Sequence, residues 1–273
     1  MQNDLKSAVG FERFWSTFGA EGILAMAWWM GTRHAERIRG QQGSYPFLQL
    51  NSDGSNAKDT LTKYLCQTCK GAQYKSLSPR SSRNAVAQTL AKAGTNVTVM
   101  DGTKPYRAGH VQYDFDVLKD YYNGADIYWP YKEDLEKTPF RGSILINGSN
   151  NLKLSEPLAS RVVTLNICAS HSICNFELIL DDLDLELAAF KLLIEKRENE
   201  ICNLISHIMP KYQASLAIQF GTAVMPRSIQ NWSLMAALVD ALSLEIGLPA
   251  DVRLAAHRLI QQSLEETHTP FPR

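Results

Sequence analysis

Residues 47–65, FLQLNSDGSNAKDTLTKYL, decide the fold class of this chain. An apolar strand, a turn of small polar residues, a lysine and a helix follow one another here, in the order of a phosphate-binding loop. In the intact pattern GxxxxGK[ST], backbone N–H groups hold the phosphates, the lysine reaches their outer oxygens and the hydroxyl binds Mg²⁺. The order predicts a strand over 47–50, a turn over 51–57 and a helix that begins near Lys58.

The residues that phosphate binding needs are mostly replaced. Two non-glycine residues stand where the motif has glycines, and a carboxylate stands at the hydroxyl position. A Cβ where left-handed backbone is required costs about 1 kcal/mol or more, and a carboxylate roughly 4 Å from a phosphate repels it by a few kcal/mol. We therefore expect no tightly bound cofactor, and only weak binding of ATP and Mg²⁺. The positions concerned are Ser52, Gly54, Ala57, Lys58, Asp59 and Thr60.

The lysine of this loop needs a partner if no nucleotide occupies it. An ion pair between Lys58 and either Asp59 or Asp101 would replace the phosphate internally and keep the empty loop folded. The alternative is that Lys58 points into solvent.

Further strands and helices alternate after the loop. Buried strands are expected at 97–101, 143–146 and 162–165, with helices over 78–93, capped by Ser81 or Ser82, and 114–122. The strand at 97–101 ends in Asp101, where P-loop ATPases place the acid that orders Mg²⁺-bound water. Gly102 replaces the second acid, which activates the attacking water in many ATPases.

Three segments differ in pattern. Residues 1–45 predict N-terminal helices, residues 46–175 a P-loop α/β core, and residues 176–273 a bundle of helices alone. Trp28 and Trp29 fit core packing of the N-terminal helices, although an exposed tryptophan pair would suit an interface.

Composition excludes little. The formal charge of the 273 residues is zero, which argues against a nucleic-acid coat protein. Residues 33–107 carry twelve Lys/Arg against four Asp/Glu, whereas residues 176–204 carry eight acids against three bases. Either a basic face lies on the first half, or two solvated surfaces have opposite bias.

No membrane span or signal peptide is expected. The apolar run GILAMAWWMG at 22–31 is shorter than the about 20 residues that cross a bilayer, so we interpret it as a buried helix. Five cysteines without a signal peptide indicate a reducing cytoplasm.

A zinc site can be assembled on paper, but we expect no metal. Cys66 and Cys69 form a CxxC, and Cys168, His171 and Cys174 offer further ligands without tight zinc spacing. Structural thiols are the preferred interpretation. His171, His207 and His257 are likewise interpreted as helix or loop residues.

Several segments together resemble a known family. The loop PFLQLNSDGSNAKDTL is similar to that of the helicase-like ATPase module at the C-terminal end of phage and mobile-element primase-helicases, often fused to a TOPRIM primase half. Further blocks occur in the same order, and the resemblance covers most of the chain. These blocks are YDFDVLKDYYNG (113–124), PFRGSILINGSN (139–150), SEPLASRVVTL (155–165) and LMAALVDALSLEIGL near the C-terminus.

The resemblance implies a RecA/AAA+-like three-layer core that acts as a ring or dimer on DNA. Lys58 falls on the phosphate-contacting lysine and Asp101 on the Walker B acid. Ser149, with Asn150 beside it, falls on the polar sensor after the third strand, a position at which Ser149 departs from the family. Arg161 falls on the arginine that acts as a finger in a neighbour's site, although it could equally tether a loop carboxylate. With no primase half before residue 1, priming would have to come from another chain.

Two functions follow from this resemblance. The joint loss of loop glycines, metal hydroxyl and second acid predicts an inactive ATPase whose Asp101, Ser149 and Arg161 are vestigial catalytic residues. Such a protein would serve a phage or mobile element as a protein-interaction or DNA-associated module, through a protein partner or self-association. The alternative is an active DNA-dependent ATPase or helicase with an atypical loop.

Overall fold

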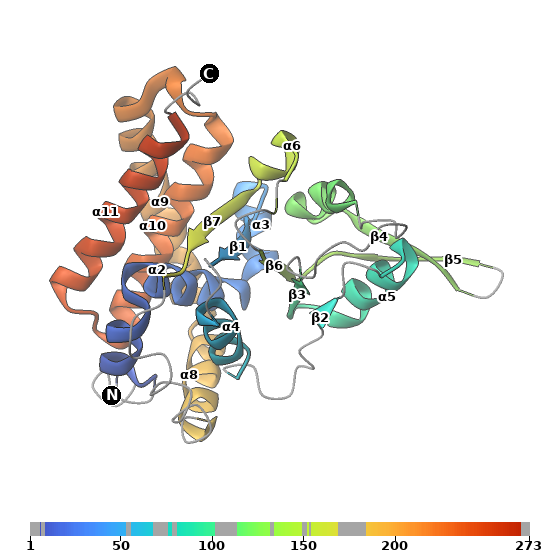
Figure 1. Cartoon of the computed structure of the whole chain (residues 1–273), viewed down its shortest axis with the longest axis horizontal. Helices are drawn as coiled ribbons and strands as arrows, with labels where there is room; N and C mark the ends of the chain where they lie inside the picture. The colour runs from blue at the N-terminus through green and yellow to red at the C-terminus, as the bar shows by residue number, and fades with distance from the viewer. Residues whose placement is uncertain are drawn as a thin grey trace.

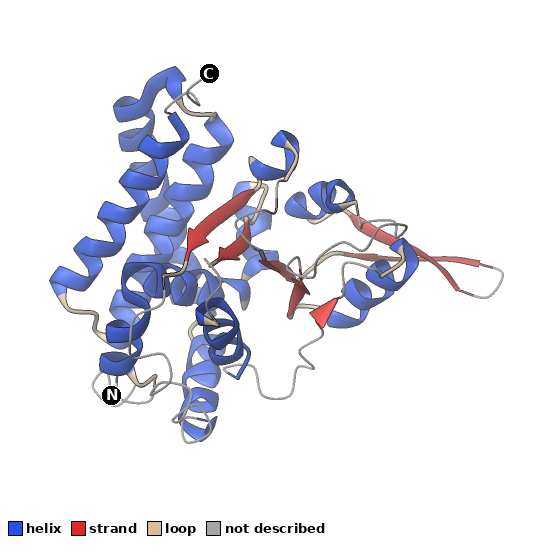
Figure 2. Cartoon of the chain, viewed as in Figure 1, coloured by secondary structure: helices blue, strands red, loops and turns tan. Residues whose placement is uncertain are grey.

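A parallel sheet lies at the centre of the protein (Figures 1 and 2). The computed structural model describes residues 6, 9–52, 56–67, 76–77, 81–101, 114–131, 134–148, 152, 154–168 and 184–268. Five strands pair in the order β2-β3-β6-β1-β7, all parallel. The strands are β1 (Phe47–Asn51), β2 (Ser76–Leu77), β3 (Val97–Asp101), β6 (Ser143–Asn147) and β7 (Val162–Asn166).

Strand β1 is central because both of its edges are paired. Leu48 is in register with Leu145 of β6 on one side and with Val163 of β7 on the other. Every residue of β1 and β6 is buried, which explains why these strands are apolar runs rather than alternating patterns. All five carboxyl ends therefore meet at one edge of the sheet.

Helices cover both faces of this sheet. Side chains of successive strand residues point to opposite faces, so Leu48 and Leu50 enter one core while Phe47 enters the other. The first core also holds α2 (Phe11–Thr32), α4 (Ala57–Gln67) and the C-terminal helices. The C-terminal helices are α8 (Asp184–Lys196), α9 (Glu198–Phe220), α10 (Pro226–Ile246) and α11 (Ala250–His268), with a short 3₁₀ turn η2 (Gly221–Ala223) between α9 and α10.

The second core is smaller and lies under α5 (Arg83–Ala93) and the 3₁₀ helix η1 (Phe115–Asn123). Ser82, one of the two expected caps, accepts a hydrogen bond from the Ala85 backbone N–H at 3.2 Å. The helix expected at 114–122 is present but is wound as a 3₁₀ helix. The short helices α3 (Ala35–Gln42) and α6 (Glu156–Ala159) complete the described set.

An antiparallel hairpin projects from this compact body (Figure 1). It pairs β4 (Asp126–Tyr131) with β5 (Asp134–Pro139), and no sequence pattern predicted it. Tyr128 and Leu135 on it are 53% and 67% exposed, so the hairpin presents apolar side chains to solvent.

The N-terminal tryptophans belong to the core, as the first interpretation held. Trp28 is fully buried and Trp29 is 4% exposed. The Trp28 indole Nε1 donates to the Pro46 carbonyl oxygen at 2.8 Å, directly before β1. Within the described residues no helix combines the length and apolar character that a membrane span requires.

Candidate nucleotide-binding edge

The loop residues lie where the strand–turn–helix order places them, at the carboxyl end of β1 and the start of α4. Ser52 follows β1 and is buried, and Ala57 begins α4 and is also buried. Gly54 falls outside the described residues. A helix N-terminus beside the carboxyl ends of parallel strands is a general location for anion binding.

Lys58 is buried beside a carboxylate of its own helix. Its Nζ lies 3.9 Å from Asp59 Oδ2, and the two side chains are 10% and 54% exposed. This is one of the two partners expected for Lys58. Because adjacent helix residues do not face each other and Asp59 is half solvated, the pair contributes little energy. Its importance is that a negative charge already stands next to the lysine.

Asn147 holds that carboxylate at the sheet edge. Its Nδ2 donates to Asp59 Oδ1 at 3.2 Å, and its Oδ1 accepts from Thr62 Oγ1 at 2.9 Å. Asn147 is only 6% exposed and closes β6. We call Lys58, Asp59, Thr62 and Asn147 the sheet-edge cluster.

Asn147 was not among the predicted site residues; the predicted polar sensor is Ser149, two residues later. Ser149 and Asn150 fall outside the described residues. The sequence signal for Asn147 was a polar residue at the end of the buried strand SILIN. In the structure Asn147 is in register with Asp101 of the neighbouring strand β3. Asp101 is half-buried at the end of β3, with β6 between it and β1.

Amide side chains link the carboxyl ends of β1 and β7. Gln49 Nε2 donates to Asn51 Oδ1 at 2.8 Å, and Asn51 Nδ2 donates to Asn166 Oδ1 of β7 at 3.4 Å. Gly148 follows β6 and packs against this group, because a Cβ there would lie 2.3 Å from Asn51 Oδ1. Amide side chains therefore occupy the carboxyl end of β1, and they leave room beside them only for a residue without a side chain.

Arg161 points into its own chain. Its Nη1 donates to the Pro157 carbonyl oxygen of α6, and its guanidinium lies 5.8 Å from the Tyr122 ring centroid. Its buried Nε has no hydrogen-bond partner. Partial burial and the charge of nearby Arg227 lower the pKa of Arg161. The partner seen is a carbonyl rather than the loop carboxylate that the tether interpretation anticipated.

Two of the five candidate zinc ligands from the sequence, Cys66 and Cys168, lie within the described residues. Cys66 is partly buried and Cys168 is exposed, while Cys69, His171 and Cys174 fall outside the described residues. Among the other histidines singled out, His257 Nε2 lies 2.9 Å from Asp240 Oδ1 and His207 Nε2 lies 3.0 Å from Lys211 Nζ.

The uneven charge has a tertiary explanation. Arg33 of the basic segment pairs with Glu195 of the acidic segment, Nη2 to Oε1, at 2.7 Å. Arg37 Nη1 lies 4.0 Å from Glu198 Oε1 and donates to Asn199 Oδ1 at 2.6 Å. Some of the charged side chains behind the uneven charge distribution therefore pair with each other where the basic and acidic segments meet. They form neither a basic face nor two separate surfaces.

Comparison with known proteins places the fold. No protein-family model matches the chain, and no curated protein does. A solved structure described as "SCCmec type IV Cch - active helicase" matches with a TM-score of 0.59 and 15% identity, over 91% of this chain and 47% of that one. A crystal structure of JCV helicase with a bound acetamide ligand gives a TM-score of 0.38 and 13% identity, over 68% and 64% of the two chains, which is too low to bear on the fold.

The chain thus spans about half the length of the first solved structure. At 15% identity this likeness shows the fold alone. Together with the parallel sheet and its flanking helices, it confirms the expected α/β, RecA-like core with a C-terminal helical region. The chain has a helicase-like fold.

Proposed function

We propose that the chain is a catalytically degenerate P-loop module, related to primase-helicases of phages or mobile elements, that acts through protein or DNA contacts rather than by hydrolysing ATP. The observation that carries the proposal is Asp59. This carboxylate stands at the Mg²⁺-hydroxyl position, accepts a hydrogen bond from Asn147 and lies 3.9 Å from Lys58.

The sheet-edge cluster and the loop before it each disfavour phosphate. A β-phosphate at this helix N-terminus would meet the Asp59 carboxylate, and like charges at roughly 4 Å repel by a few kcal/mol at an effective dielectric near 20. The Cβ atoms of Ser52 and Ala57 also occupy the space that motif glycines leave open for close approach of phosphate to backbone. The repulsion and the crowding both raise the free energy of the ATP-bound state. They therefore lower the affinity for ATP as well as any rate of hydrolysis.

The projecting hairpin supports a contact with a protein partner or a second copy. Its exposed apolar side chains, Tyr128 and Leu135, lie among acids, since Asp126, Asp134 and Glu136 outnumber Lys137 in the described strands. DNA contacts rely on basic groups that neutralise phosphates. The hairpin therefore suits protein association better than DNA association.

An active ATPase is the second candidate, and one observation favours it. Asp101 is in register with Asn147, which in turn bonds Asp59. Two carboxylates at this edge could share Mg²⁺, because carboxylate and phosphate oxygens are its preferred ligands. Mg²⁺ would then offset the repulsion of phosphate by Asp59.

Calorimetry with Mg-ATP and ATPase assays with single- and double-stranded DNA separate the two candidates. We expect Mg-ATP to bind with a dissociation constant above the millimolar range and DNA to stimulate no turnover. Lys58→Ala tests the motif lysine, and Lys63→Ala, an exposed lysine on the same helix, is the matched control. Turnover that Lys58→Ala abolishes and Lys63→Ala leaves intact would overturn the proposal in favour of the active enzyme.

Contact with partners is tested on the same protein. Sedimentation of the wild-type chain and of Leu135→Ser reports self-association, and fluorescence anisotropy with labelled DNA at two salt concentrations reports nucleic-acid binding. Association that Leu135→Ser weakens supports the hairpin as the contact. Tight, strongly salt-dependent DNA binding would assign the module to DNA instead.

A further inference from the structure

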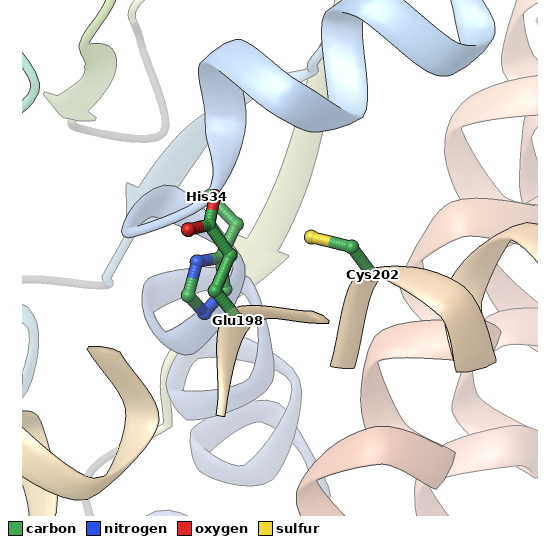
Figure 3. A group of neighbouring side chains, drawn as sticks. All are labelled: His34, Glu198 and Cys202. Atoms are coloured by element: carbon green, nitrogen blue, oxygen red, sulfur yellow. The ribbon is translucent and has the colours of Figure 1, made fainter. Parts of the chain in front are cut away.

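Three potential metal ligands meet where the N-terminal helices contact α9 (Figure 3). His34 lies in the connection between α2 and α3, and Glu198 and Cys202 lie on α9. Glu198 and Cys202 are four residues apart on this helix, so their side chains lie on the same face. One ligand atom from each of the three residues lies within 4.8 Å of the others. We call these residues the helix-junction cluster.

The imidazole of His34 has a buried nitrogen that no protein atom among the described residues satisfies. His34 is 3% exposed, and its Nε2 is buried without a hydrogen-bond partner. A buried polar atom left unpaired costs roughly 1–3 kcal/mol, so such atoms are rare and require an explanation. Figure 3 shows the His34 ring and the Glu198 carboxylate side by side, with the Cys202 sulfur pointing toward them.

We propose that His34, Glu198 and Cys202 form a Zn²⁺ site. Imidazole nitrogen, thiolate sulfur and carboxylate oxygen are the three ligand types that Zn²⁺ accepts in proteins. A thiolate selects against Mg²⁺ and Ca²⁺, which prefer oxygen ligands. Three protein ligands leave one position of a tetrahedral site for water.

Metal binding releases a proton at this site. Zinc takes cysteine as the thiolate and histidine as the neutral ring, so the Cys202 thiol proton passes to solvent when the ion binds. We therefore expect zinc affinity to rise with pH.

Neighbouring arginines do not block the site. Arg37 lies 4.0 Å from Glu198 Oε1 but also donates to Asn199 at 2.6 Å, so it keeps a partner when Glu198 turns to a metal. Arg33 is engaged by Glu195 at 2.7 Å. Two anionic ligands offset the charge of the ion. A cavity of about 340 Å³, lined by His34 and Glu198 among others, gives solvent and metal a route.

A metal here would join segments that are far apart in sequence. Contacts beside the cluster already link residues 162 positions apart, Arg33 with Glu195 and Arg37 with Asn199. Zn²⁺ would fasten the α2–α3 connection to the first turns of α9. Because metal that binds only the folded state stabilises it, zinc should raise the melting temperature, by about 5 °C or more at a hundredfold excess over its dissociation constant.

Titration of the purified full chain with Co²⁺, followed by competition with Zn²⁺, tests the site. We expect one ion per chain and a sulfur-to-cobalt charge-transfer band. Cys202→Ala should abolish the band, and Glu198→Ala should weaken Zn²⁺ binding by more than the about 10- to 100-fold cost of losing an outer-shell partner. Cys66→Ala, which removes a different thiol, should leave both unchanged.

Two results would overturn the site. One is the absence of a thiolate band on Co²⁺ addition; the other is a band that Cys66→Ala removes and Cys202→Ala preserves, because zinc would then use the CxxC. Glu198 is exposed, so its alanine variant should fold even if Cys202→Ala does not. Circular dichroism and thermal melting without metal verify the fold of each variant.

Discussion

The sheet-edge cluster and the helix-junction cluster are opposite cases of a candidate ligand site. The first has a motif in the sequence, yet its polar groups bond one another: Asn147 bonds Asp59 and Thr62, and Asp59 approaches Lys58. The second has no motif, yet the His34 Nε2 is buried without a partner. A recognisable order of strand, loop and helix therefore does not make a site open to a ligand, whereas an unsatisfied buried nitrogen among potential metal ligands marks a candidate site.

Trp28→Ala should have the largest effect and should damage both sites together. Trp28 is fully buried, packs 6.1 Å from the Tyr45 ring centroid and bonds the residue before β1. We expect a loss of about 3–5 kcal/mol in the free energy of unfolding, measured by urea denaturation. Trp129→Ala on the hairpin is the control. A change below about 1 kcal/mol would mean that the two sites do not depend on this shared core.

Restoring the motif should affect the sheet edge alone. The variant Ser52→Gly, Ala57→Gly, Asp59→Thr removes the repelling carboxylate and two Cβ atoms. Relief of a few kcal/mol corresponds to an about 100-fold gain in Mg-ATP affinity, measured by calorimetry. Adding Lys58→Ala should cancel the gain. Cobalt binding at the helix-junction cluster should not change, and a parallel change there would show that the clusters are coupled.

Asn147→Ala tests whether the sheet edge is held together internally. The substitution removes the Asn147 oxygen that accepts from the buried Thr62 hydroxyl, and it releases Asp59; Thr62 is 1% exposed. We expect the free energy of unfolding to fall by about 1–3 kcal/mol. Asn166→Ala, which removes only a 3.4 Å bond from Asn51, should cost about 0.5 kcal/mol or less. Equal effects of the two variants would contradict the cluster.

Asp240→Asn should have the smallest effect. Asp240 serves as a reference for the two clusters, because its carboxylate has hydrogen-bond partners within the protein. Burial raises the pKa of Asp240, but hydrogen bonds from His257 and Tyr212 outweigh it and set the pKa below 3.8. A lowered pKa stabilises the folded state above pH 3.8 and loses that contribution as pH falls through the lower folded value. The variant should lose about 1 kcal/mol at pH 7 and progressively less below pH 4. Thermal melting between pH 2 and 7 measures this, and a constant difference would refute the linkage.

Much of the α/β core was predictable because its signals are local. The runs at 47–50, 97–101, 143–146 and 162–165 are strands of one sheet, and Ser82 caps α5. The β4–β5 hairpin and the 3₁₀ winding of η1 were not predicted. The residues of η1 do follow a helical period, with Phe115, Leu118 and Tyr122 buried, but that period does not distinguish a 3₁₀ helix from an α-helix. The hairpin leaves much of its surface in solvent, so burial does not impose a pattern on it.

The candidate sites divide in the same way. The order of strand, loop, lysine and helix can be read from the sequence, as can the replacements at Ser52, Ala57 and Asp59, because all of these lie within one continuous segment. The contact of Asn147 with Asp59 and the approach of His34 to Cys202 come from the packing of distant segments. Such contacts join residues brought together by the packing of helices and strands, and no local period or spacing records which distant side chains will share a buried space.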